Sequence, residues 1–122
     1  HAGLNTAPLF APAVVPVFRG MLVEVPLSVD ASIADAAFDT LATHFEDSSL
    51  VSVRRAGDES ELLLRKSDAA TDRMELMLYA DPSGSQLRLI ARLDNLGKGA
   101  SGACVQNLNI MAGLPETAGL RL

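Results

Sequence analysis

A glycine-rich stretch near the end of the chain constrains its local fold most strongly. Residues 94–109 read DNLGKGASGACVQNLN. An alternating run before this stretch and an amphipathic one after it predict a strand, a tight turn and the start of a helix. The unpaired N–H groups and the positive dipole end of a first helical turn attract anions. The sequence therefore predicts an anion site here, with Gly97, Gly99 and Gly102 allowing close approach and Lys98 adding charge.

The spacing Gly97-x-Gly99-x-x-Gly102 matches the dinucleotide-binding pattern, but its context does not. That pattern needs a second strand and an acidic residue roughly 20 positions further on, inside a βαβ unit of about 30 residues. No second strand is predicted between Gly102 and Leu122. The dinucleotide interpretation of these glycines is therefore rejected.

Composition limits the remaining possibilities. The 122 residues are 48% hydrophobic and only 4% aromatic, without Trp, which predicts one domain with an aliphatic core. A net charge of −5 argues against nucleic acid and anionic membrane surfaces as partners. One cysteine makes no internal disulfide, and no apolar run approaches the ~18 residues of a membrane span. We expect a cytoplasmic protein, and a chain that begins at His1 is expected to be part of a longer one.

The first half of the chain predicts an extended lead-in, a strand and a helix. Three prolines within residues 1–16 disfavour a helix there. Residues 17–29 alternate as a strand does, and Pro26 suggests that the strand lies at a sheet edge. Residues 32–46 have helical spacing, with Ser32 and Asp35 resembling a capping box. We expect this helix to lie on a sheet.

The second half predicts more strands and a final helix. Strands are expected at residues 50–54, 61–66, 74–80 and 86–93, and the turn at 81–84 makes the last two an antiparallel hairpin. In the last strand, alternate leucines from Leu87 should face inward and Arg88 and Arg92 outward, toward solvent or an interface. The final helix, 98–112, should bury Cys104, Leu108 and Met111 and end at Gly113. The order predicts an α+β domain: a largely antiparallel sheet with helices on one face.

Residues 94–114 resemble the C-terminal signature of N-acetyl-γ-glutamyl-phosphate reductases, D-N-L-x-K-G-A-S-G-x-A-V-Q-N-x-N-x-M-x-G-L, with Cys104 at the family's alanine. Residues 7–10, 12–14 and 20–27 are similar to the shorter, second type of this reductase. Aspartate-semialdehyde dehydrogenases share only the core D-N-x-x-K-G-A. The resemblance implies that this chain is the C-terminal substrate and dimerisation domain, with residues 97–113 forming its glycine-rich turn and last helix. The dinucleotide-binding domain would precede His1.

The resemblance also implies a chemistry whose main residues lie elsewhere. Reductases of this family convert N-acetyl-γ-glutamyl phosphate to N-acetylglutamate semialdehyde in arginine biosynthesis, using a cysteine thioester, NADPH and a histidine. The N-P-G-C-Y-P-T motif of the nucleophile and the H-x-H-x-P-E motif of the histidine are both absent from the sequence. His1 would lie just downstream of the second motif, and His44 and Cys104 are expected to be structural. We therefore expect no catalytic residue and no metal site in this chain.

The same resemblance assigns binding residues. Asn95 would reach the nicotinamide carboxamide, and Gly97, Lys98, Gly99 and Ala100 would lie against the cofactor or a substrate phosphate. Arg19 would bind the acyl phosphate.

Simpler roles remain open for these residues. Asn95 would then cap the turn, and Lys98 would be solvated. The preference between NADP and NAD is also open. A homo-oligomer is expected, because related reductases build dimers from this domain's sheet. The alternatives are a catalytically silent α+β binding or assembly module, or part of an aspartate-semialdehyde dehydrogenase.

Overall fold

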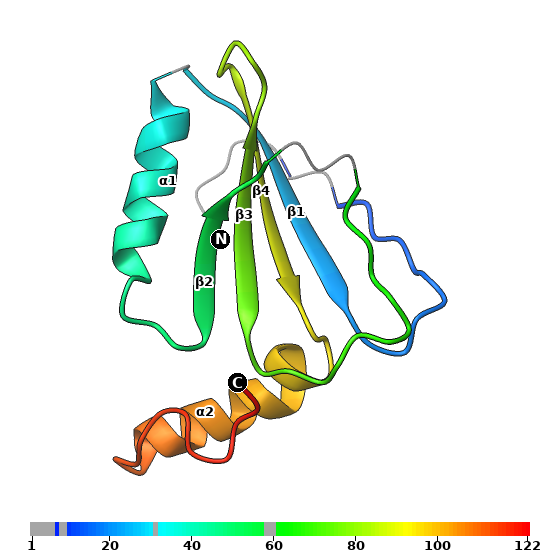
Figure 1. Cartoon of the computed structure of the whole chain (residues 1–122), viewed down its shortest axis with the longest axis vertical. Coiled ribbons are helices and arrows are strands. Elements are labelled where there is room, and N and C mark those ends of the chain that lie inside the picture. The colour runs from blue at the N-terminus through cyan, green and yellow to red at the C-terminus, as the bar shows by residue number, and fades with distance from the viewer. Residues whose placement is uncertain (1–6, 8–9, 31, 58–60) are drawn as a thin grey trace.

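A computed structural model describes residues 7, 10–30, 32–57 and 61–122. Its strands stand side by side as one sheet, with one helix beside the sheet and a second helix beneath its end (Figure 1). The elements in chain order are β1 (Met21–Ser28), α1 (Ile33–His44), β2 (Val51–Arg55), β3 (Met74–Ala80), β4 (Gln86–Leu93), the π-helical turn η1 (Gly97–Ser101) and α2 (Gly102–Met111).

The sheet confirms the predicted α+β class. Its strand order is β1-β4-β3-β2. Strand β4 is antiparallel to both of its neighbours, β1 and β3, whereas β2 runs parallel to β3. The sheet is thus mostly antiparallel but mixed. β1 is an edge strand, as Pro26 indicated, because Pro cannot donate to a ladder on both sides.

The β3–β4 hairpin has the predicted bounds and turn. The N–H of Gly84 donates to the carbonyl of Asp81 at 2.9 Å, which closes the four-residue turn. Neither Pro82 nor Ser83 has a positive φ, as a type I turn requires. The Asp81 carboxylate also accepts from the Gln86 N–H at 2.7 Å. Local turn chemistry therefore sets the register that aligns the two strands.

The register divides the sheet into two faces. Side chains alternate along a strand, so every second residue of β1 lies on the same face as the β4 and β3 residues paired with it. On the first face these residues are hydrophobic, and we call it the apolar face. Helix α1 lies on this face beside β2, where Arg55 pairs with Asp35 at 2.6 Å and stacks over the Phe38 ring. The members of the apolar face are Met21, Val23, Val25, Leu27, Val51, Val53, Met74, Leu76, Leu78, Leu87, Leu89, Ala91 and Leu93.

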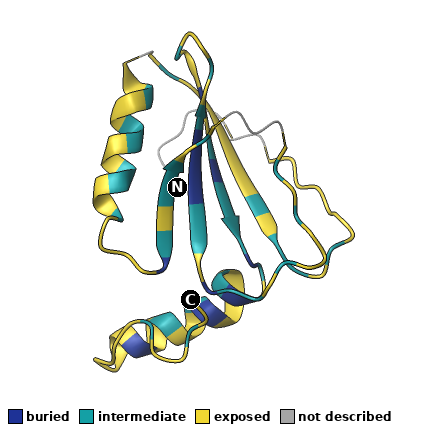
Figure 2. Cartoon of the chain, in the orientation of Figure 1, coloured by how far each residue is buried: buried dark blue, intermediate teal, exposed yellow. Residues whose placement is uncertain are grey.

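The opposite, polar face is more buried than the sequence pattern suggested. Ile90 is 1% exposed and Met77 is fully buried, and both belong to this face (Figure 2). Leu87 is buried and Arg88 exposed, as expected, but the side of β4 that carries Arg88 also buries Ile90. The loop before β3 lies against part of this face, where Asp68 meets Arg92.

The strand predicted at residues 61–66 is absent. Residues 61–65 have no regular secondary structure, although Leu62 and Leu64 alternate with exposed neighbours as strand residues do. Both sides of β3 are already paired, with β2 and with β4. Because β2 and β3 are parallel, the chain must cross over between them, and this segment is the crossover. It is extended without joining the sheet.

Helix α1 occupies the predicted position, but the predicted capping box is wrong. Ser32 makes no side-chain cap hydrogen bond and has helical backbone angles, φ −69° and ψ −15°. A capping serine needs an extended backbone to fold its hydroxyl over the first turn. The N–H of Ile33 instead donates to the carbonyl of Asp30 at 2.8 Å.

Helix α2 presents the opposite side to the one expected. Cys104, Leu108 and Met111 are exposed, Leu108 by 63% and Met111 by 84%. The buried positions of α2 are Gly102 and Asn109 (Figure 2). The expected burial of Cys104 is therefore wrong. The loop before β3 packs on Gly102 and the C-terminal tail on Asn109, both on the other side of this helix.

The buried polar face gives a stability prediction. We expect Ile90→Ala to lower the free energy of unfolding by about 2–5 kcal/mol, because it leaves a cavity at a fully buried site. Val14→Ala, at a side chain that is 97% exposed, should change it by less than about 0.5 kcal/mol. Chemical denaturation of both variants checks this. A loss at Ile90 no larger than at Val14 would mean that the polar face is open.

Candidate functional site

The carboxylate of Asp94, at the end of β4, joins several parts of the chain. Its side chain is 3% exposed and accepts from the Arg19 guanidinium at 2.6 Å. It also accepts from the N–H groups of Leu96 at 2.9 Å and Thr71 at 3.3 Å. Asp94 thus links the segment before β1, the crossover and the start of η1.

These donors keep Asp94 ionised. Burial alone raises the pKa of this carboxyl, because it disfavours the charge. Hydrogen bonds from the Leu96 N–H, the Arg19 guanidinium and two further backbone N–H groups outweigh burial, so the pKa lies below its ordinary value of 3.8. Asp94 is therefore a structural anion and not a proton donor.

Gly97 of η1 and Gly102 of α2 pack closely against the loop before β3. A Cβ on Gly97 would lie 2.2 Å from the carbonyl oxygen of Thr71, and one on Gly102 would lie 2.0 Å from the Asp72 carboxylate. The turn from η1 into α2, which we call the tip, can approach the loop at Thr71 and Asp72 this closely only because Gly97 and Gly102 have no side chain. Close packing on the loop therefore accounts for Gly97 and Gly102, and their predicted approach to a ligand stays a prediction.

Several N–H groups on which the predicted anion site depends already have acceptors in the protein. The Lys98 N–H donates to the Thr71 carbonyl at 3.3 Å and the Gly99 N–H to the Asp94 carbonyl at 2.9 Å. The Leu96 N–H donates to the Asp94 carboxylate, so these three donors are used within the protein. The Lys98 ammonium is not simply solvated, since it donates to the Gln106 amide oxygen at 2.5 Å.

The C-terminal tail braces the loop beneath the tip. Asp72 and Arg121 are joined in both directions, by the Asp72 N–H to the Arg121 carbonyl and the Arg121 N–H to the Asp72 carboxylate, each at 2.8 Å. The Asn109 amide donates to the carbonyls of Glu116 and Ala118 at 3.1 and 2.9 Å. Asn109 of α2 therefore fixes the C-terminal tail, and the tail in turn fixes the loop at Asp72 through Arg121.

Asn95 is bonded to the residue that follows Arg19. Its side-chain oxygen accepts from the Gly20 N–H at 2.8 Å, and Gly20 adopts a positive φ of 110°. The bond ties the residue after Asp94 to the residue after Arg19, and it differs from the turn-capping role considered above. Among the tip residues, Gly99 and Ala100 are exposed and Gly97 is buried.

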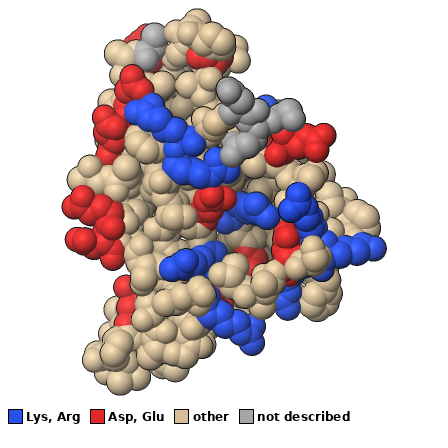
Figure 3. All heavy atoms as spheres, viewed as in Figure 1, with Lys and Arg blue, Asp and Glu red and all other residues tan. Residues whose placement is uncertain are grey.

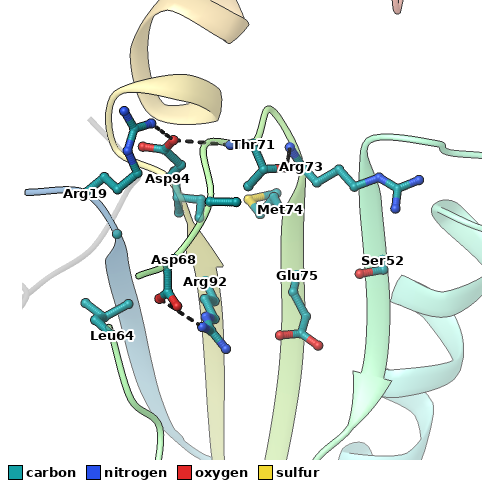
Figure 4. A pocket seen from close by; sticks show the side chains of 13 residues that line it. Arg19, Ser52, Leu64, Asp68, Thr71, Arg73, Met74, Glu75, Arg92 and Asp94 are labelled. Carbon is teal, nitrogen blue, oxygen red and sulfur yellow. Dashed lines mark hydrogen bonds and ion pairs between the residues drawn. The ribbon is translucent and has the colours of Figure 1, made fainter. Parts of the chain in front are cut away.

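A pocket of about 400 Å³ opens next to this cluster. Arg19 and Asp94 stand on one side of it, and Arg73 extends to the other side across β2, above Ser52 (Figure 4). Acidic and basic side chains lie side by side on the face seen in Figure 3, with no extended patch of one sign. The pocket is lined by Arg19, Gly20, Ser52, Leu64, Asp68, Ala69, Thr71, Arg73, Met74, Glu75, Arg92, Leu93 and Asp94.

Sequence reasoning missed much of this pocket. Arg92, expected to face solvent or an interface, lines the pocket and pairs with Asp68 at 3.3 Å. Asp68 and Arg73 come from the loop before β3, which carries no periodic signal. Only the parallel pairing of β2 and β3, which sends the crossover over the polar face, brings them to the site.

Other candidates lie away from the pocket. His44 is exposed, and its ring packs edge-on against Phe45 with 4.6 Å between ring centroids. His1 lies outside the described residues. Within the ranges that the structure covers, no three His, Cys, Asp or Glu side chains gather as a metal site would require. Nor is any helix there long and apolar enough to cross a membrane.

Comparisons with known proteins agree on one group. Residues 1–95 match the family described as semialdehyde dehydrogenase, dimerisation domain. The N-acetyl-γ-glutamyl-phosphate reductase of Trichormus variabilis is 41% identical over 131 residues, covering 98% of this chain and 40% of the relative. That of Rhizobium meliloti is 41% identical over 118 residues, covering 91% and 38%. The chain thus spans about two fifths of the length of these relatives.

The depressed pKa of Asp94 gives a pH-dependent prediction. Asp94→Asn should lower the free energy of unfolding by about 2 kcal/mol near neutral pH, because an amide accepts these charged hydrogen bonds poorly. A carboxyl whose folded-state pKa lies below 3.8 stabilises the fold above that pH, and this contribution is lost as pH falls through the folded-state pKa. Urea denaturation at pH values from about 7 down to about 3 should show the stability difference between wild type and Asp94→Asn shrinking. A difference independent of pH would contradict the role of the charge.

Proposed function

This chain belongs to the semialdehyde dehydrogenase dimerisation-domain family, and from that membership we propose the activity of the whole protein. The protein is an NADPH-dependent N-acetyl-γ-glutamyl-phosphate reductase of the cytoplasm, acting in arginine biosynthesis, and this chain is its C-terminal part. One observation carries the proposal. Relatives about 40% identical over nearly the whole chain bear that enzyme's name.

The chemistry requires a thiolate, a hydride and a proton. A cysteine thiolate attacks the acyl carbon and phosphate leaves, which gives a thioester. NADPH supplies the hydride that reduces this thioester. The resulting hemithioacetal collapses to the aldehyde and releases the thiol, with a histidine exchanging the proton. In this proposal the cysteine and the histidine come from the preceding part of the protein.

Asn95 fits the nicotinamide end of the cofactor. The Gly20 N–H holds its side-chain oxygen, and its NH₂ group donates no hydrogen bond to the residues that the structure describes. This group is left to donate to the oxygen of the carboxamide. The exposed Gly99 and Ala100 would make van der Waals contact with the cofactor or the substrate, and Lys98 would attract its negative charge. The N–H groups of Lys98 and Gly99 already donate within the protein, so these two are not left for the cofactor's phosphates.

Arg19 fits the acyl phosphate. One of its guanidinium nitrogens is held by Asp94, which fixes the plane of the group at the pocket wall. A guanidinium has five N–H donors, so several are left for phosphate oxygens. The assignment makes Asp94 a positioning residue, because it acts on substrate only through Arg19.

Asn95 provides the test of the activity. In the full-length protein, Asn95→Ala should raise KM for NADPH by about tenfold or more, because a cofactor hydrogen bond is lost. Asn107→Ala, at an exposed position of α2, is the control and should leave KM unchanged. Spectrophotometry of NADPH oxidation measures both.

The same assay separates the alternatives. Turnover of N-acetyl-γ-glutamyl phosphate supports the reductase, and turnover of aspartyl phosphate instead supports aspartate-semialdehyde dehydrogenase. Comparing NADPH with NADH settles the cofactor preference. The 122 residues alone should be inactive under either enzyme proposal. A full-length protein that reduces neither acyl phosphate would favour the silent binding module.

We further propose that a second copy of the chain covers the β1 part of the apolar face. The β1 residues there are 37% to 45% exposed, whereas α1 covers the β2 end. A strip of like residues suits a two-fold interface, which uses one patch twice. The members of this strip are Met21, Val23, Val25 and Leu27.

A charge on this strip should separate the copies. Val25→Asp is expected to shift the full-length protein from dimer to monomer in sedimentation velocity, because it places an unpaired carboxylate in an apolar interface. Glu24→Gln, on the opposite face of β1, is the matched control and should leave the dimer intact. A Val25→Asp protein that remains dimeric would move the interface elsewhere.

A further inference from the structure

Arg73 is distinguished by the pairing of the charges around the pocket. Asp94 pairs with Arg19 at 2.6 Å, and Asp68 pairs with Arg92 at 3.3 Å. The third pocket carboxylate, on Glu75, pairs with Arg54 at 2.7 Å. Each acidic side chain of the pocket wall is thus neutralised by an arginine.

Arg73 remains as the cation of the pocket wall with no carboxylate partner among the described residues. Its side chain is exposed, and its Nε donates to the carbonyl of Ser49 at 3.2 Å. That bond fixes one edge of the guanidinium over β2. The two terminal NH₂ groups are left to bind an anion.

The place of Arg73 suits the far end of a substrate with two anionic groups. Figure 4 shows it extending away from Arg19, on the opposite side of the pocket. N-acetyl-γ-glutamyl phosphate carries an acyl phosphate at one end and an α-carboxylate at the other, and acetylation removes the charge of its nitrogen. With Arg19 on the phosphate, a second cation is needed at the other end.

We propose that Arg73 binds the α-carboxylate of the substrate and so selects acyl phosphates derived from acidic N-acylated amino acids. This rests on the proposed function. The paired carboxylates of Asp68 and Glu75 do not repel such a substrate, because each is offset by its arginine. Planar, bidentate contact with a carboxylate is the interaction that a guanidinium makes best.

The test compares two inhibitors of the full-length enzyme that differ by one carboxylate. N-acetylglutamate carries the α-carboxylate, and N-acetyl-γ-aminobutyrate is the same chain without it. Wild-type enzyme should bind the first about tenfold or more tightly than the second, and R73Q should lose this preference. In parallel, KM for the acyl phosphate should rise in R73Q by about tenfold or more, with kcat changed far less.

Two further variants make the result specific. R73K keeps the charge but loses the bidentate contact, so its preference should lie between those of wild type and R73Q. This variant also carries the test if R73Q folds poorly. R88Q, at a largely exposed arginine near the other end of β4, should keep the wild-type preference.

The outcomes separate this inference from the function on which it rests. A wild-type enzyme that does not reduce N-acetyl-γ-glutamyl phosphate overturns the proposed function and this assignment with it. A wild-type enzyme that does, with the inhibitor preference retained in R73Q, overturns the role of Arg73 alone. A loss of kcat with unchanged inhibitor preference would also overturn it, since that pattern indicates a structural effect.

Discussion

The site depends on one buried ionised carboxylate. Asp94 ends the most constrained strand of the sheet and fixes the position of the segment before β1, the crossover loop and the first turn of η1. A carboxylate that is only 3% exposed would strongly destabilise the fold if it were unpaired. The fold therefore depends on the hydrogen-bond donors around Asp94. Removing any of them would disturb the others, because all share two oxygen atoms.

The parallel pairing of β2 with β3 has the second largest effect. It forces the chain to cross over between the two strands, and the crossover supplies Asp68, Thr71 and Arg73 to the pocket. An antiparallel arrangement would have needed only a short turn there. One pairing choice thus supplies a wall of the site.

The sequence allowed the hairpin to be predicted to the residue, because a period of two and the turn chemistry at 81–84 are both local signals. It did not reveal the fate of residues 61–66, because the same alternation fits a crossover that passes the sheet without joining it. The exposed Leu108 is a second example, because apolar residues at helical spacing do not reveal which part of the chain, if any, covers them. Arg19 and Asn95 were expected from a resemblance, whereas Arg73 needed the crossover to be seen.

The close packing of Gly97 and Gly102 on the loop affects how glycine patterns are interpreted. A Cβ at either position would overlap Thr71 or Asp72, which the tail holds from below through Arg121. Natural selection would therefore preserve both glycines in any descendant that kept this contact, even one that had lost its ligand. Motif searches that equate such spacing with nucleotide recognition would misclassify these descendants, because they would be detecting steric fit between two backbone segments.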